Sequence, residues 1–377
     1  MSSHLHLQRT DMTEQEALAK MIAPGTPRPT KWRQGVIQIL ITSRCDKSCF
    51  SCTQASQLEN GGRSDMIPDQ FAQAVDSLKG YFGVVGVFGG NPAMSRHFID
   101  ICRVFRESWV PFEQRGIWSN NPITPEKCQA MRETFNPHFS NLNVHLDRKA
   151  FEMFKTGWPE SMPVGLDQDS RHSPPWIAMK DVLKKPCTNS QHAAEDDGAM
   201  FFAPCQECGG TRKVYDESLA WDLISRCDIN QHWSAGIGVF RGQLRAWFCE
   251  VAMAQALLHQ HEMDYPDSGI PFLSLSGYGL FHLAEGKDFV GPWWEQPMEF
   301  FADQVRKHCH ECGIPMRGYG QLAQDKNPTA PERVSQTHAA VCKPKAKDRP
   351  VQIVTNRLQV REQSLGKVTH YLQNASK

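Results

Sequence analysis

Short apolar runs alternate with segments of helical periodicity in the first half of the chain. Residues 35–41 form a β-rich apolar run, as found in strands buried on both faces of a parallel sheet. Three similar runs and three helical segments follow. The predicted strands cover residues 35–41, 84–88, 115–120 and 142–146, and the predicted helices cover residues 68–82, 95–107 and 125–135.

The helical segment at 68–82 illustrates the pattern. Phe71, Val75, Leu78 and Phe82 fall on one stripe of a helix, and Pro68 suits its first turn. Strands that alternate with helices in this way predict a parallel α/β sheet or a partial (β/α) barrel. In such folds the functional residues lie at the carboxyl ends of the strands.

The second half of the chain has a different texture. Residues 151–210 are rich in proline, aspartate, serine and glycine, which predicts long loops or an insertion. Two apolar runs at 233–240 and 244–248 flank a glycine-containing turn and predict a β-hairpin. Helices are expected at 249–261 and 297–308.

These patterns divide the chain into four parts. The expected fold is α/β, a partial barrel followed by a small α+β domain. The parts are an N-terminal extension at 1–34, a barrel with an insertion at 35–210, a smaller domain at 211–342 and a tail at 343–377.

Charge is balanced over the whole chain but not along it. Lysine plus arginine and aspartate plus glutamate number 41 each, so the total favours no nucleic-acid or membrane partner. Residues 343–377 carry five lysines and three arginines against two acidic residues, a net charge of +6. We interpret them as a solvated basic tail, with a contact to phosphate or nucleic acid as the alternative.

Cysteine content indicates the compartment. There are 13 cysteines, several in short Cys-x-x-Cys spacings. In a large chain with an odd number of cysteines, this pattern favours metal ligands over disulfides and therefore a reducing environment. No early segment resembles a signal peptide, and no run reaches the roughly 18 apolar residues of a membrane span. We expect a soluble, cytoplasmic protein.

Three cysteines directly follow the first predicted strand. Cys45, Cys49 and Cys52 have the spacing Cys-x3-Cys-x2-Cys. Three thiolates can bind three irons of a [4Fe–4S] cluster and leave the fourth iron for a small-molecule ligand, whereas a structural metal site normally closes all of its positions. Arg44 and Lys47 favour deprotonation of these thiols. A zinc knuckle or three packed free thiols is the alternative.

The motif and its position after the first strand resemble the radical S-adenosylmethionine (radical SAM) superfamily. The resemblance implies a partial (β/α)6-type barrel, a [4Fe–4S] cluster on the three cysteines, and S-adenosylmethionine (SAM) bound to the open iron. It also implies the chemistry. One electron from the cluster cleaves SAM, and the resulting 5′-deoxyadenosyl radical abstracts a hydrogen atom from an organic substrate.

Further residues match positions that contact SAM in that superfamily. The segment after the second strand resembles the family's Gly-Gly-Glu-Pro turn, with asparagine in the glutamate position, and consists of Gly89, Gly90, Asn91 and Pro92. Ser119 and Asn120 end the third strand, where polar contacts to ribose or carboxylate are common; capping of the strand end is the alternative. Phe50 is the candidate for packing on adenine.

Eight more cysteines lie beyond the four predicted strands. Cys227 and Cys249 flank the predicted hairpin, and Cys309 and Cys312 end the last predicted helix. This arrangement resembles the SPASM and twitch domains of radical SAM enzymes and implies one auxiliary [4Fe–4S] cluster on these four cysteines. Two cysteines within predicted helices, Cys102 and Cys128, are expected to be buried without a ligand role.

The remaining four cysteines leave three interpretations open. A second auxiliary cluster, a zinc site and no metal all fit Cys187, Cys205, Cys208 and Cys342. Cys205 and Cys208, like Cys309 and Cys312, form a Cys-x-x-Cys-Gly knuckle, and the two knuckles together could hold one zinc ion.

The expected function is therefore radical SAM chemistry on an organic substrate such as a peptide, a sugar or another small molecule. The same chemistry on a nucleotide or nucleic-acid base is the alternative, through the basic tail. A zinc-stabilised binding protein without catalysis is the alternative of a different class. The expected partners are the substrate and an electron donor such as flavodoxin or ferredoxin, with no membrane partner.

Overall fold

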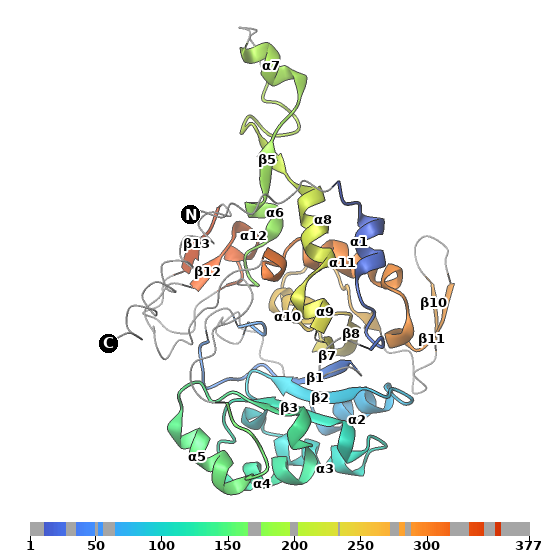
Figure 1. Ribbon diagram of the computed structural model, residues 1–377, viewed down its shortest axis with the longest axis vertical. Helices are drawn as coiled ribbons and strands as arrows, with labels where there is room; N and C mark the ends of the chain where they lie inside the picture. The colour runs from blue at the N-terminus through green and yellow to red at the C-terminus, as the bar shows by residue number, and fades with distance from the viewer. Residues whose placement is uncertain are drawn as a thin grey trace, which may run out of the picture.

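A seven-stranded, mainly parallel sheet forms the centre of the molecule (Figure 1). The computed structural model describes residues 11–27, 35–49, 52–55, 65–164, 175–196, 203–232, 234–271, 279–282, 288–316, 332–342 and 351–355. In sheet order the strands are β4 Asn141–Leu142, β3 Arg115–Ser119, β2 Val84–Gly89, β1 Val36–Thr42, β7 Ser234–Phe240, β8 Gln243–Trp247 and β9 Ile270–Pro271.

β1 is the innermost element of this sheet. All seven of its residues are buried, and it pairs in parallel with β2 on one side and β7 on the other. Parallel pairing continues through β3 to β4, while β8 and β9 are antiparallel. The expected α/β fold with a parallel central sheet is confirmed.

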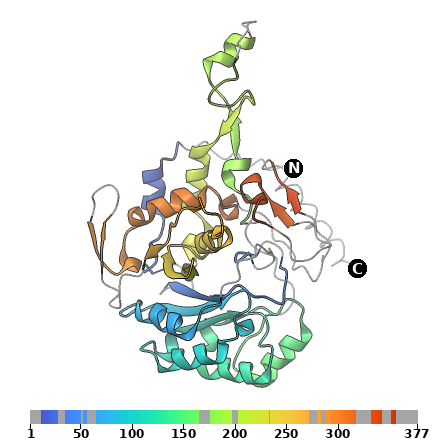
Figure 2. The same cartoon turned by 180° about the vertical axis from the view of Figure 1, so that it is seen from behind.

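Four helices cover one face of the parallel strands (Figures 1 and 2). They are α2 Pro68–Asp76, α3 Phe98–Glu107, α4 Pro125–Thr134 and α5 Arg148–Gly157. Pro68 occupies the first turn of α2, and the Thr124 hydroxyl accepts a hydrogen bond from the Lys127 N–H at the start of α4. Edge-to-face packing of Phe71 on Phe105, with ring centroids 5.4 Å apart, joins α2 to α3.

The segment after β3 departs from the sequence prediction in two ways. The strand predicted at 142–146 ends at Leu142, because His145 and Leu146 have φ values of 47° and 68° that no strand residue adopts. Next, Asp147 caps α5 by accepting from the Ala150 N–H at 3.0 Å. α5 therefore occupies the start of the region where long loops were expected, with Phe154 buried against the core.

The predicted hairpin is present and extends the same sheet. Phe240 pairs with Gln243, which leaves Arg241 and Gly242 as a two-residue turn with φ values of 47° and 81°. β7 pairs with β1, so residues expected in the smaller domain share a sheet with the barrel. The division at residue 210 stays a prediction.

Further helices pack on the opposite side of the sheet from α2 to α5 (Figures 1 and 2). These are α1 Glu14–Lys20, α8 Glu217–Ser225, α9 Asp228–His232, α10 Glu250–His259 and α11 Ala302–Cys309. α10 contacts β7, β8 and α11, while α1 contacts α8 and buries Ala17 and Leu18. The described part of the N-terminal extension thus belongs to the folded body.

A narrow arm extends from this body (Figure 1). Its described residues are 184–196 and 203–215. They begin and end with the antiparallel strands β5 Lys184–Pro186 and β6 Lys213–Tyr215, with α7 Ser190–Asp196 near the far end of the arm. The remaining elements are α6 Met179–Val182, α12 Gln336–Ala339, β10 Gly279–His282, β11 Asp288–Gly291, β12 Glu332–Val334, β13 Val351–Ile353 and the short 3-10 helices Pro92–Met94, Phe112–Gln114, Pro137–Phe139, Trp293–Glu295, Met298–Phe301 and Ile314–Met316. Among the described helices, none has the length and apolar character needed to cross a bilayer.

Candidate metal centres and cofactor site

The three-cysteine loop starts at the carboxyl end of β1. The Thr42 hydroxyl accepts from the Arg44 N–H at 3.2 Å and donates to an Asp65 carboxylate oxygen at 2.5 Å, and the Arg44 guanidinium lies 3.0 Å from the same carboxylate. Cys45 is buried, and Cys49 and Cys52 are half-buried. These contacts fix the direction in which the cysteine loop leaves β1 before it reaches Cys45.

Cys45 is held by hydrogen bonds to its sulfur. The Asn120 side-chain amide donates to Cys45 Sγ at 3.3 Å, and the Lys47 N–H donates at 3.4 Å. Burial raises the pKa of the Cys45 thiol to about 11, although these two hydrogen bonds act to lower it. A thiol in this environment needs a metal to become a thiolate, which is the form that binds iron.

The second polar atom of the Asn120 side chain is its oxygen, Oδ1. This oxygen is buried, and among the residues that the structure describes it has no hydrogen-bond partner. A buried amide oxygen without a partner is costly, so this atom fits a ligand that brings an N–H or O–H group. The predicted contact of Asn120 with SAM is compatible with this geometry, and the contact with Cys45 adds a second role.

The glycine turn after β2 packs directly on the cysteine loop. The Gly90 N–H donates to the Thr42 carbonyl at 2.9 Å, and the Asn91 N–H donates to the Arg44 carbonyl at 2.6 Å. A Cβ atom on Gly90 would lie 2.3 Å from the Arg44 carbonyl oxygen, which is closer than real Cβ contacts come. Glycine is therefore required here for close passage of two backbones. Pro92 follows and is buried.

Asn91 is fully buried, and both polar atoms of its side chain form hydrogen bonds. Its amide nitrogen donates to Asp46 Oδ1 at 3.1 Å and to the Asn121 carbonyl at 2.9 Å, and its oxygen accepts from the Ser119 hydroxyl at 2.9 Å. A glutamate in this position would place a second carboxylate beside Asp46 and could not donate. The asparagine thus links the cysteine loop to the ends of β2 and β3.

His145 is a site residue that the sequence pattern missed. Its Nε2 atom lies 3.4 Å from Cys49 Sγ, and the neighbouring Asp147 lies 2.8 Å from Lys47 Nζ. The left-handed backbone at His145 and Leu146 makes these contacts possible. A polar residue at the end of the fourth apolar run is the signal that could have indicated it.

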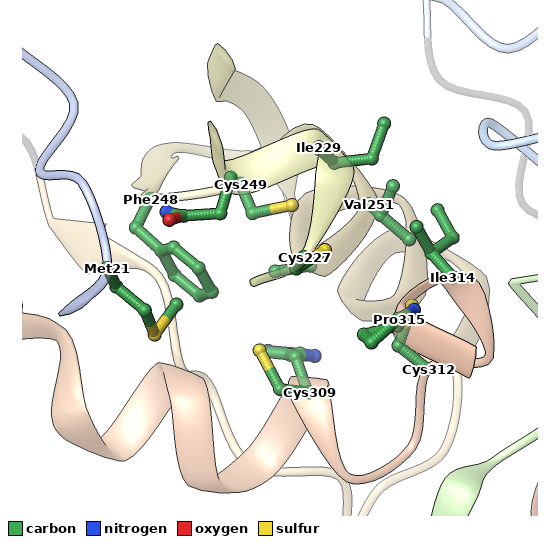
Figure 3. Close-up of a pocket in the computed structure, with 13 residues that line it drawn as sticks. Met21, Cys227, Ile229, Phe248, Cys249, Val251, Cys309, Cys312, Ile314 and Pro315 are labelled. Atoms are coloured by element: carbon green, nitrogen blue, oxygen red, sulfur yellow. The ribbon is translucent and has the colours of Figure 1, made fainter. Parts of the chain in front are cut away.

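The predicted auxiliary cysteines converge on one cavity (Figure 3). Cys227, Cys249, Cys309 and Cys312 all line it, together with apolar side chains that include Phe248. Cys227 and Cys249 directly precede α9 and α10, Cys309 ends α11, and Cys312 follows within three residues. Four thiols from three separate segments with apolar walls between them form a closed donor set.

The pKa values of these four thiols are raised above the ordinary value, mainly by burial. Burial raises the pKa of Cys227 to about 11 and that of Cys249 to about 12, and it raises those of Cys309 and Cys312 well above the ordinary value. The proximity of the other cysteines raises the values of Cys249, Cys309 and Cys312 further. Four thiolates can share this space only when a cationic centre compensates their charge.

The last four candidate cysteines do not form one group. Cys187, Cys205 and Cys208 meet in the arm, where His192 joins them, and the four ligand atoms all lie within 4.8 Å of one another. Cys342 is buried in an apolar cluster with Trp176 and Leu258. The two Cys-x-x-Cys-Gly knuckles therefore belong to different sites and do not share a zinc ion.

Phe50, the candidate for packing on adenine, lies outside the described residues. Cys52 is positioned through its backbone, because the indole N–H of buried Trp176 donates to the Cys52 carbonyl at 3.0 Å. Cys102 and Cys128 are buried within α3 and α4, as expected.

No protein-family model matches the sequence, and no curated protein matches it. Solved structures do match, with low identity. BtrN in complex with AdoMet and 2-DOIA is 11% identical with a TM-score of 0.37, over 74% of this chain and 92% of BtrN. Streptococcus suis SuiB is 17% identical with a TM-score of 0.23, over 31% of this chain and 26% of SuiB.

SuiB bound to the precursor peptide SuiA gives a similar result, with 16% identity and a TM-score of 0.25 over 37% of this chain and 29% of SuiB. BtrN and SuiB are radical SAM enzymes. The chain resembles them in fold. At these identities and scores the resemblance carries nothing about substrate or mechanism, and the assignment of ligands rests on the residues described above.

The Asn91 network gives a sharp prediction. Asn91→Asp changes one atom type but places a carboxylate beside Asp46 in a buried position, so we expect the free energy of unfolding to fall by about 3 kcal/mol. Asn121→Asp is the matched control, because Asn121 also donates to Asp46, at 3.1 Å, but is half-exposed. That change should cost under about 1 kcal/mol. Equal losses in denaturant titrations of the two variants would contradict the network.

Proposed function

We propose that this protein is a radical SAM enzyme that abstracts a hydrogen atom from an organic substrate. The observation that carries the proposal is the grouping at the carboxyl ends of three adjacent parallel strands. The cysteine loop follows β1, the glycine turn follows β2, and Asn120 follows β3 with its amide on Cys45 Sγ. Three thiols in one loop supply an incomplete ligand set, as a cluster with an open iron requires.

The residues around the loop have distinct tasks in this proposal. Cys45, Cys49 and Cys52 would hold a [4Fe–4S] cluster, which with bound SAM supplies one-electron cleavage to a 5′-deoxyadenosyl radical. Asn120 and the Lys47 N–H orient the Cys45 sulfur and stabilise its negative charge. Trp176 fixes the backbone of Cys52.

We assign SAM contacts to the same strand ends. Asn120 Oδ1 would accept from a ribose hydroxyl or the methionine amino group, since it is a buried acceptor. Ser119 and Asn91 would act indirectly, because each already bonds the other. Gly89 and Gly90 keep the backbone close to the loop, and adenine packing by Phe50 stays a prediction.

The cavity of Cys227, Cys249, Cys309 and Cys312 would hold an auxiliary [4Fe–4S] cluster of the SPASM or twitch type. Four cysteines close every iron, so the cluster would have no open position for a substrate. We therefore propose electron relay as its role. A zinc site was one of the interpretations that the sequence left open. Its candidate ligands lie in the arm, apart from both proposed iron sites.

Substrate and partners complete the proposal. The substrate is a peptide, a sugar or another small molecule, with a nucleotide or nucleic-acid base as the alternative through the basic tail. A flavodoxin or ferredoxin would supply the electron. The chain has 13 cysteines, most of which we assign to metal sites, and this use of cysteine supports a reducing compartment such as the cytoplasm. A zinc-stabilised binding protein remains the alternative of a different class.

The proposal is tested by product formation. Protein reconstituted anaerobically with iron and sulfide is reduced with dithionite in the presence of SAM, and 5′-deoxyadenosine is quantified by chromatography. The radical SAM assignment predicts its formation above a protein-free control. A protein that contains zinc in place of iron, lacks the visible iron–sulfur absorption and forms no product would support the binding protein instead.

A further inference from the structure

The tip of the arm lies between residues 187 and 212, and its described residues have few buried side chains to hold it together. In its described parts, 187–196 and 203–212, the buried residues are His192, Cys205 and Cys208. Figures 1 and 2 show the arm projecting from the body, so the body cannot supply a core for the tip. A segment of this size without an apolar core usually depends on a metal or a disulfide.

The buried side chains of the tip are metal-ligand types, and they meet. Sγ of Cys187, Cys205 and Cys208 and a ring nitrogen of His192 all lie within 4.8 Å of one another. His192 Nε2 is 3.0 Å from Cys208 Sγ. Ligands around one zinc ion at about 2.3 Å from sulfur would lie about 3.8 Å apart. The four atoms are therefore close to the corners of a single tetrahedral site.

The backbone shapes this site in advance. The Gly209 N–H donates to the Cys205 carbonyl at 2.8 Å, and Gly209 and Gly210 have φ values of 55° and 81°, which closes a tight knuckle around both cysteines. The Cys187 N–H donates to the Arg212 carbonyl at 3.0 Å. This bond continues the pairing of β5 with β6 and brings Cys187 to the knuckle.

Glu195 and Arg212 orient the imidazole ring of His192. His192 Nδ1 lies 3.1 Å from Glu195 Oε2, which leaves Nε2 facing the cysteines. Arg212 in turn donates to Glu195 at 3.3 Å and to Asp196 at 2.8 Å. A carboxylate on the second nitrogen of a histidine is the usual support for a zinc ligand, because it sets the tautomer and the ring orientation.

The distances between the four ligand atoms also indicate which kind of metal centre they can form. In a [4Fe–4S] cluster each cysteine binds a different iron, so its sulfurs lie farther apart than the ligands of one ion. Three thiolates and one imidazole in a closed tetrahedral set match structural zinc. We infer that Cys187, His192, Cys205 and Cys208 bind one zinc ion that holds the arm tip in its fold.

This inference is independent of the proposed radical chemistry and has its own test. The full chain is purified anaerobically without added zinc, and zinc and iron are measured by mass spectrometry. We expect about one zinc per chain, with X-ray absorption at the zinc edge showing three sulfur neighbours at about 2.3 Å and one nitrogen at about 2.0 Å.

His192→Asn is the variant that tests the ligand set. We expect it to release zinc to a chromogenic chelator at least tenfold faster than wild type and to lose the nitrogen neighbour. His138→Asn, which changes an exposed histidine of the body, should leave both readouts unchanged. Iron content and 5′-deoxyadenosine formation should be normal in both variants, which shows that the body has folded.

Two outcomes would overturn the inference. One is wild-type protein that is replete in iron but contains no zinc. The other is zinc that His192→Asn retains with unchanged neighbours and unchanged release, which would place the metal elsewhere.

Discussion

Cys49→Ala is expected to abolish 5′-deoxyadenosine formation. Cys49 is half-buried in the loop after β1, with its sulfur 3.4 Å from His145 Nε2. In the proposed site it holds one of three ligated irons, and two thiolates do not retain a four-iron cluster against exchange with solvent. Product measured by chromatography after reduction with dithionite should fall to the level of the protein-free control. Iron content should fall by about four atoms per chain.

Cys102→Ala is the matched control for this change. Cys102 is a buried cysteine of α3 and packs in the main core. Its truncation should cost about 1 kcal/mol of stability and leave iron content and product formation unchanged. Normal product formation by Cys49→Ala, with Cys102→Ala also active, would show that the loop after β1 does not hold the catalytic cluster.

Cys309→Ala is expected to remove the second group of irons while sparing the first. Cys309 ends α11 and lines the cavity with Cys227, Cys249 and Cys312. Wild-type protein should contain about eight irons per chain and the variant about four. SAM cleavage under dithionite should persist, because Cys45, Cys49 and Cys52 have their own ligand set. Thermal stability should drop, since a metal bound only in the folded state contributes to folding.

Cys342→Ala provides the comparison for this variant. Cys342 is buried in the C-terminal half but packs in the apolar cluster with Trp176 and Leu258, away from the four cavity cysteines. It should retain about eight irons. Two results would contradict an auxiliary cluster: about four irons in wild-type protein, or about eight in Cys309→Ala.

Periodicity predicted the parts of the fold that depend on local pattern. The buried run of β1, the stripe of α2 and the hairpin of β7 and β8 each have a signal within a short stretch of consecutive residues. The strand predicted at 142–146 failed because apolar residues there serve a turn, in which His145 and Leu146 adopt left-handed conformations. Sequence pattern does not distinguish an apolar turn from a short strand.

The order of the strands in the sheet and the contacts between distant side chains could not be predicted from such local patterns. β7 pairs with β1, although 191 residues separate Thr42 from Ser234. His145 contacts Cys49 from a left-handed turn, and His192 contacts Cys208 from α7, and neither contact has a periodic signal in the sequence. Counting cysteines grouped Cys342 with the arm cysteines, whereas the structure places a histidine there. Cysteine spacing identifies ligands within one loop but not those that the fold brings from elsewhere.

The central claim is that the loop after β1 holds an iron that is open to SAM. Electron–nuclear double resonance on the reduced protein with SAM labelled by 15N at its amino group tests this claim most directly. We predict a nitrogen hyperfine coupling to the cluster that persists in Cys309→Ala and is absent in Cys49→Ala. A cluster that is present and reduced in wild-type protein but shows no coupling to the labelled nitrogen would contradict the account.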